Sequence, residues 1–138
     1  MLQRLVSINA IVWIALGIAF GLYGPLMLNL FGVPEVPSED LLLYWNVAAF
    51  ARLYGAALFG LGLILLALRG MIARVSQQDQ RGVLFSLVFA NIMGAFVAAT
   101  QSATIWQAAA GWILMAHYLI FAVLYGLMLA SHPAKAQA

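Results

Sequence analysis

The chain has 138 residues, of which 66% are hydrophobic and only 7% are charged, and its mean hydropathy is +1.03. A soluble domain has about 25% charged residues, so this composition excludes one and indicates a protein that needs lipid as its solvent. The net charge of +2 forms no basic patch, which argues against nucleic-acid binding. The absence of cysteine excludes disulfides and thiolate chemistry.

The first apolar stretch, residues 5–34, contains no Asp, Glu, Lys or Arg. About 20 apolar residues cross a bilayer, so this stretch predicts one span from Leu5 to Phe31. It is too long for the hydrophobic part of a cleaved signal, which favours a retained span. Pro25 is expected to loosen its last turns. One face carries mostly small residues that predict close helix packing, namely Ala10, Trp13, Gly17, Gly21 and Gly24.

A short polar connection, residues 32–40, separates this span from the next one. Ser38, Glu39 and Asp40 are expected to cap and stabilise the start of the second helix. That helix is predicted from Leu41 to Leu68, and residues 70–82 are predicted to form a polar loop.

Residues 82–134 carry no formal charge and are too many for one helix. The sequence therefore predicts a hairpin at residues 104–111, between spans at 83–105 and 112–130. The fold class that follows is an all-α membrane protein, an up-and-down bundle of four transmembrane helices that forms a single domain over residues 1–138.

The cations predict how the bundle is oriented. With four spans both chain ends lie on one side of the membrane, and Arg4, Arg69, Arg74, Arg81 and Lys135 all fall on that side. The positive-inside rule then places both ends and the middle loop in the cytoplasm. Indole rings favour the membrane interface, and three of them are expected near the outer boundary, at Trp45, Trp106 and Trp112.

Arg52 is a cation inside the second predicted span. A charge at mid-bilayer is costly, so such residues usually face the bundle or water. On a helical wheel, Arg52 shares a face with the packing candidates Gly55 and Ala56, and Tyr54 lies on the opposite face. Arg52 is therefore expected to point inward. A count of about 1.5 Å per residue places it ~16 Å from Leu41, in the outer half of the membrane.

The same count brings Tyr23, Gln101 and His117 to the depth of Arg52, which predicts a polar layer without a carboxylate. Asn91 is expected deeper, on a packing face of its span that also carries Ala98. Two interpretations of Arg52 remain open. Either backbone carbonyls, Gln101, Tyr23 and water satisfy it, and it fixes helix register. Or it meets an anionic or strongly accepting group from outside the chain, such as a lipid phosphate, a quinone carbonyl or a partner's acid.

His117 raises the question of a bound haem. A four-helix membrane bundle can hold haem between histidines on two helices. The other histidine, His132, lies fifteen residues later and near the opposite end of the same span, so the pair cannot sandwich one haem within a monomer. A histidine satisfied within the bundle is the favoured interpretation. A single axial ligand to haem or a pigment is the alternative, and no metal site is predicted.

The segment LFGVP and the later run ARLYGAALFGLGLILLALRG resemble small four-span bacterial inner-membrane proteins of unknown function, including DoxX-like ones. The resemblance covers most of the chain in layout. It implies a four-helix bundle in a bacterial inner membrane, and it assigns no catalytic or ligand residue. The chain lacks the cysteines of some redox-linked relatives of that layout.

The sequence favours a non-enzymatic integral membrane protein that packs, as an accessory or assembly subunit, against a larger membrane complex or a second copy. The alternative is a small bundle that binds a quinone, haem, pigment or anionic lipid near Arg52, Gln101 and His117. A small channel or transporter is a third hypothesis. It is disfavoured because the predicted spans contain no Asp or Glu to couple ion movement.

Overall fold

The computed structural model of the chain describes residues 1–33, 41–72, 74–106 and 108–131. These residues form five α-helices and no strand: α1 (Leu2–Leu22), α2 (Gly24–Leu30), α3 (Leu41–Ile72), α4 (Gln77–Thr104) and α5 (Ala109–Ala130). All except α2 are long and apolar enough to cross a membrane. The prediction of an all-α bundle is therefore confirmed, and the chain has the architecture of a multi-pass integral membrane protein.

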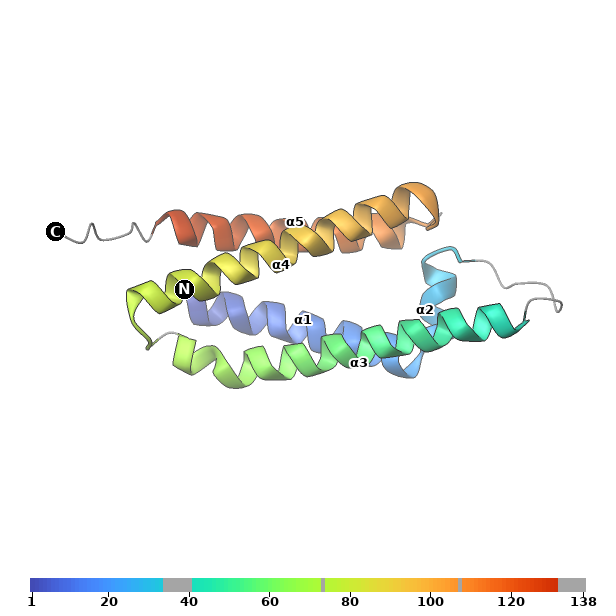
Figure 1. Cartoon of the computed structure of the whole chain (residues 1–138), viewed down its shortest axis with the longest axis horizontal. Helices are drawn as coiled ribbons and strands as arrows, with labels where there is room; N and C mark the ends of the chain where they lie inside the picture. The colour runs from blue at the N-terminus through green and yellow to red at the C-terminus, as the bar shows by residue number, and fades with distance from the viewer. Residues whose placement is uncertain (34–40, 73, 107, 132–138) are drawn as a thin grey trace.

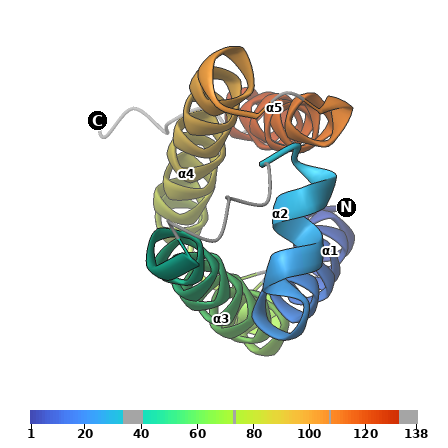
Figure 2. The same ribbon diagram turned by 90° about the vertical axis from the view of Figure 1, so that its right-hand side faces the viewer.

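The four long helices run alternately up and down and form a ring in the order α1, α3, α4, α5 (Figures 1 and 2). The closest backbone approaches are within two hairpins, α1 with α3 and α4 with α5. One end of the bundle carries the N-terminus and the α3–α4 connection, and we call it the arginine end. The opposite end carries α2, and we call it the α2 end.

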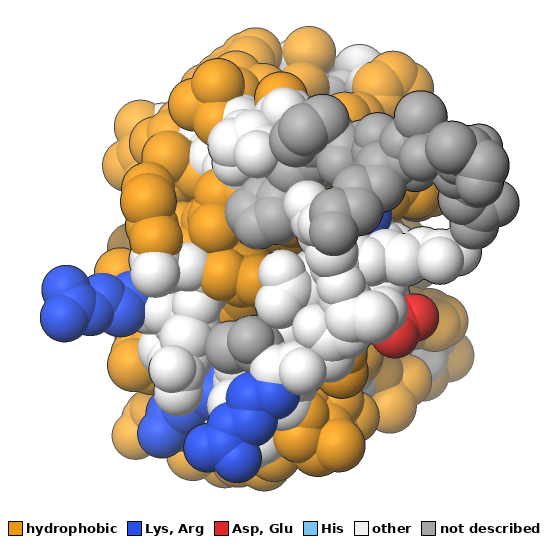
Figure 3. Space-filling model, turned by 90° about the vertical axis from the view of Figure 1, so that its left-hand side faces the viewer, with side chains coloured by type: hydrophobic (Ala, Val, Ile, Leu, Met, Phe, Trp, Pro, Cys, Tyr) orange, Lys and Arg blue, Asp and Glu red, His pale blue; other side chains and the backbone are white. Residues whose placement is uncertain are grey.

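The arginine end is marked by its charged side chains. It contains Arg4, Arg69, Arg74 and Arg81, as well as Asp79, which is the only acid in the described part of the chain. Figure 3 shows basic side chains projecting at this end beside hydrophobic flanks. Large apolar side chains are exposed along the flanks, as is expected of surfaces that face lipid.

The first predicted span is wrong as a single helix, because the backbone breaks at Tyr23. That residue has φ −117° and ψ 36°, which ends α1, and α2 then begins at Gly24 with Pro25 in its first turn. Proline has no N–H and is favoured at a helix start, so the break falls just before it. The effect of Pro25 is therefore stronger than the expected loosening of the last turns. After the break, α2 turns across the end of the bundle (Figure 2).

The predicted polar loop at residues 70–82 is also too long, because helices occupy most of it. Helix α3 continues to Ile72, and α4 begins at Gln77. The Ser76 Oγ accepts a hydrogen bond from the Asp79 N–H at 3.2 Å and donates one to the Asp79 carboxylate at 2.6 Å. Because of this cap, α4 begins several residues before the apolar stretch begins. The predicted cap at residues 38–40 lies outside the described residues.

Glycines set the contact between α1 and α3. A Cβ added at Gly17 would lie 2.5 Å from the Phe59 backbone nitrogen, and one at Gly55 would meet the backbone of Gly21. Gly62, one turn further along the same face of α3 from Leu58, would place its Cβ 2.9 Å from the Ala10 carbonyl oxygen. Only glycine permits so close an approach of two helix backbones.

Two clusters of buried side chains fill the interior. The cluster at the arginine end contains Val6, Leu84 and Tyr125, each fully buried, and draws on all four long helices. The cluster at the α2 end is largely aromatic and includes Trp13, Phe20, Phe31 and Tyr118. The two ends differ in how completely these side chains fill the ring.

Candidate functional site

The α2 end encloses a cavity of about 480 Å³ between the α1–α3 hairpin and the α4–α5 hairpin. Pockets for small molecules in proteins usually have volumes of about 300–1,000 Å³. All five helices and the α4–α5 turn contribute to the wall, which consists of Phe20, Leu28, Val47, Phe50, Ala51, Tyr54, Met93, Gly94, Val97, Ala98, Trp106, Leu114 and Tyr118.

Small residues on facing helices leave the space open. Ala51 on α3 and Gly94 and Ala98 on α4 line the cavity and contribute little side-chain volume to it. Gly94 is itself covered by the Tyr118 ring, because a Cβ added there would lie 2.8 Å from the ring. Small residues on both helices therefore help to keep the space between the hairpins open.

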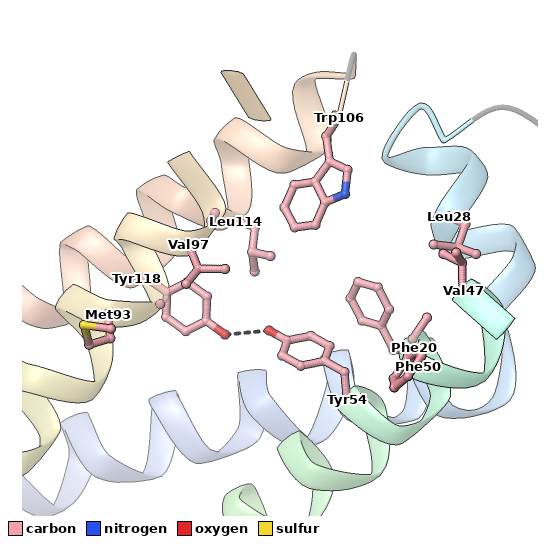
Figure 4. Close-up of a pocket in the computed structure, with 13 residues that line it drawn as sticks. Phe20, Leu28, Val47, Phe50, Tyr54, Met93, Val97, Trp106, Leu114 and Tyr118 are labelled. Carbon is pink, nitrogen blue, oxygen red and sulfur yellow. Dashed lines mark hydrogen bonds between the residues drawn. The ribbon is translucent and has the colours of Figure 1, made fainter. Parts of the chain in front are cut away.

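Helix α2 and the α4–α5 turn close the cavity toward the α2 end. Leu28 of α2 and Trp106 of the turn both line it, and Figure 4 shows them above the tyrosine side chains. The ring of Phe31, at the end of α2, packs edge-on against Trp106 with centroids 4.6 Å apart, and against Phe20 at 5.5 Å. These aromatic contacts hold α2 across the bundle.

The polar centre of the cavity is a pair of tyrosine hydroxyls. Tyr54 on α3 and Tyr118 on α5 point toward each other from opposite sides, and their oxygens are 2.8 Å apart, within hydrogen-bond distance (Figure 4). The indole of Trp106 is the other polar group among the lining residues, and none of these residues carries a formal charge. The site is suited to an apolar molecule with one group that forms a hydrogen bond.

The side of the cavity is formed by residues that also face the membrane. Val47 and Phe50 on α3 are 38% and 71% exposed, and Met93 and Val97 on α4 are 46% and 48% exposed. Helices α3 and α4 are neighbours in the ring but have no close backbone packing. The opening between them therefore connects the cavity with the lipid phase.

Arg52 does not face the interior, and this corrects the orientation expected from the helical wheel. Its side chain is exposed, and its stem covers Gly24 at the start of α2, where an added Cβ would lie 3.2 Å from the Arg52 Cγ. Tyr23 is next to that glycine and is 58% exposed. Ala56 is exposed too, so the buried stripe of α3 runs through Gly55 and not through its neighbour.

The four members of the predicted polar layer differ in exposure, and among the described residues no hydrogen bond joins them. Arg52 and Tyr23 lie on the outside near the start of α2, whereas Gln101 is half-buried on α4 and His117 is half-buried on α5. None of the four lines the cavity. Of the predicted packing residues, Asn91 and Ala98 are buried, and the Asn91 amide donates to the Leu87 carbonyl oxygen one turn earlier at 2.8 Å.

His117 packs as an aromatic side chain. Its ring lies against Phe121 with centroids 4.8 Å apart and against Tyr118 at 5.6 Å. Its Nε2 is buried and forms no hydrogen bond with a described residue. Within the described residues no group of three or more metal-binding side chains occurs. His132 lies outside the described residues.

Sequence reasoning missed Tyr54 and Tyr118, the two residues that place hydroxyls in the cavity. The helical wheel predicts Tyr54 on the side of α3 away from the packing glycines, but its ring packs edge-on against Phe20 of α1, with centroids 5.3 Å apart, while its hydroxyl meets that of Tyr118. In a ring each helix has a neighbour on both sides, and Tyr54 lies on the side of α3 that faces the α4–α5 hairpin. An intramembrane tyrosine on α5, Tyr118, facing small residues on α4 is the sequence signal that was available.

Comparisons of the chain with protein-family models, with curated proteins and with solved structures found no match.

Proposed function

We propose that this membrane protein binds a small lipophilic molecule in the cavity at the α2 end. The observation that carries the proposal is the cavity itself, which combines an apolar wall with the hydrogen-bonded hydroxyls of Tyr54 and Tyr118. Ligand pockets are typically lined by apolar and aromatic side chains with a few placed polar groups. A quinone, a pigment or a lipid fragment has the matching chemistry.

The ligand is proposed to enter from the membrane, between α3 and α4. The cavity side there is formed by lipid-exposed residues of both helices, including Phe50 and Val97. A molecule dissolved in the bilayer reaches this opening without crossing water. Its chain or tail can stay in the lipid while its polar group reaches the tyrosines.

A blocking substitution tests this proposal. Val97→Trp is expected to fill the opening, and organic extraction of the purified variant should then lose a stoichiometric ligand that the wild type retains. Ile92→Trp is the matched control, because Ile92 is also on α4 and 49% exposed but does not line the cavity. Mass spectrometry of both extracts gives the result. The proposal is wrong if the wild type carries nothing and binds no lipophilic probe.

We further propose that the arginine end faces the cytoplasm of a bacterial cell, which would place both chain ends inside. The clustering of four arginines at that end supports this orientation through the positive-inside rule. The absence of cysteine allows a direct test. A membrane-impermeant maleimide applied to intact cells should label Ala109→Cys, at the α2 end, and leave Ser76→Cys unlabelled. The opposite labelling pattern would reverse the orientation.

A second candidate function is that of an accessory subunit, and the exposed position of Arg52 favours it. An arginine on a membrane-facing surface is costly unless it meets an accepting group. No described residue forms an ion pair or hydrogen bond with Arg52, and a partner helix with a carboxylate would supply one. On this proposal Arg52→Gln loses a larger assembly in native electrophoresis of membranes, whereas Arg52→Lys keeps it. Identical migration of wild type and both variants would exclude this role for Arg52.

A further inference from the structure

The tyrosine pair in the cavity has one hydroxyl hydrogen that is not used in the bond between the two residues. Each hydroxyl carries one hydrogen, and the bond between Tyr54 and Tyr118 uses one of the two. No other described residue forms a hydrogen bond with either hydroxyl oxygen. One O–H is therefore left directed away from the pair, beside a space that is large enough for a ligand.

The remaining O–H is a stronger hydrogen-bond donor than an isolated tyrosine hydroxyl. A hydroxyl that donates while accepting from another hydroxyl is polarised by it, and the effect is larger in an apolar medium. Among the lining residues only the Trp106 indole is also polar, and it too is a donor. An unsatisfied donor within the membrane is unfavourable, so the site favours a molecule that brings an acceptor.

The wall of the cavity restricts the charge and the shape of the rest of the ligand. It carries no formal charge, which disfavours a ligand that is ionised within the cavity. The rings of Phe20, Phe50 and Trp106 line it, and aromatic side chains pack well against flat ring systems. A carbonyl accepts a hydrogen bond without bringing a hydrogen that needs its own partner.

We propose that the ligand is an uncharged, membrane-soluble ring compound whose carbonyl accepts a hydrogen bond from the Tyr54–Tyr118 pair. Its ring lies against the aromatic wall, and any tail leaves between α3 and α4. This inference rests on the proposed function, since it names the ligand class for the same cavity. It assigns the tyrosines a role in selecting the ligand rather than in any reaction.

Three probes of matched size test the ligand class. They are 2-methyl-1,4-naphthoquinone, which has carbonyls, 2-methyl-1-naphthol, which has a hydroxyl, and 2-methylnaphthalene, which has neither. Binding is measured by quenching of tryptophan fluorescence in lipid nanodiscs and corrected for partition into empty nanodiscs. The quinone is expected to bind about tenfold more tightly than the hydrocarbon, the effect of one net hydrogen bond. Its bound carbonyl stretch should shift to lower frequency in the infrared.

Substitution of the tyrosines identifies the donor. Either Tyr54→Phe or Tyr118→Phe leaves one hydroxyl able to donate, so each single variant is expected to lose no more than a few-fold in quinone affinity. The double variant should bind the quinone and the hydrocarbon equally and abolish the infrared shift. Tyr44→Phe is the control, since Tyr44 is on α3 but does not line the cavity.

The outcomes separate this inference from the proposed function. Equal binding of all three probes to the wild type, or tighter binding of the naphthol than of the quinone, overturns the carbonyl inference and leaves a lipophilic cavity. Binding of none of the probes overturns both. The infrared shift in the wild type is informative even if the double variant fails to fold, because its absence would exclude the hydrogen bond directly.

Discussion

The arginine end and the α2 end use the same four helices but fill their interiors differently. At the arginine end, side chains from every long helix meet, and Val6, Leu84 and Tyr125 are fully buried. At the α2 end, the side chains that face the centre include Ala51 and Ala98, and a cavity remains between the hairpins. A continuous ring of helices is therefore closed at one end and hollow at the other.

Each end also contains a tyrosine hydroxyl in a hydrogen-bonded pair. At the arginine end the Asn9 amide donates to the Tyr125 hydroxyl at 3.2 Å, and both side chains are fully buried. At the α2 end Tyr54 and Tyr118 bond to each other beside the cavity. A sealed polar pair ties helices together, whereas a pair beside a cavity is available to a ligand. The following substitutions test that distinction.

The largest effect is expected at the glycine contact that brings α1 and α3 together. In Gly55→Ala the new Cβ would lie 2.8 Å from the Gly17 carbonyl oxygen and would also meet the backbone of Gly21, so the helices must separate. Overpacking of this kind costs about 3 kcal/mol of unfolding free energy, which equilibrium unfolding in detergent measures. Gly60→Ala, with nothing within 4 Å of its Cβ, should leave stability unchanged or raise it by up to about 1 kcal/mol, because alanine is the better helix former. Equal effects would disprove the contact.

The next largest effect is expected for Tyr125→Phe at the closed end. The substitution leaves the buried Asn9 amide without the partner that it now has, and neither Asn9 nor Tyr125 lines the cavity at the α2 end. The expected loss is about 1 kcal/mol of unfolding free energy, measured in the same detergent assay. A double-mutant cycle with Asn9→Ala should show coupling between the two positions. Additive losses would mean that the pair contributes nothing.

A smaller loss is expected for Tyr54→Phe at the hollow end. The Tyr118 hydroxyl loses its partner, but the cavity beside it gives water or a ligand access to that hydroxyl. We expect a loss of about 0.5 kcal/mol in ligand-free protein. A loss equal to that of Tyr125→Phe would show that the Tyr54–Tyr118 pair is as inaccessible as the Asn9–Tyr125 pair, which would weaken the proposed function.

The smallest effect on stability is expected for Arg52→Gln. The side chain is exposed, and only its stem covers the buried Gly24, so shortening it to glutamine opens no space in the interior. The unfolding free energy of the isolated protein should change by no more than about 0.5 kcal/mol, with normal membrane insertion. A loss above about 2 kcal/mol would instead support the interpretation in which Arg52 fixes helix register.

The helical fold could be predicted from sequence because length and hydropathy specify helices that cross a bilayer. Helix ends were less predictable. Capping by Ser76 starts α4 within a polar stretch, and Pro25 produces a break where a single span was expected. Both depend on a few local interactions that compete with the hydropathy pattern. The candidate site was less predictable still, because a helical wheel does not show which neighbour each side of a helix faces.

The sequence by itself determined that lipid is the solvent, that four spans cross it, and that glycines form packing faces on the first two spans, since each depends on composition or on spacing along one helix. The tertiary structure decided that Arg52 lies outside, that Tyr54 meets Tyr118, and that α2 closes one end over a cavity. These facts depend on the order of helices around the ring and on the small residues that face each other across it. A tyrosine 64 positions away in sequence becomes a hydrogen-bond partner only when two hairpins come together.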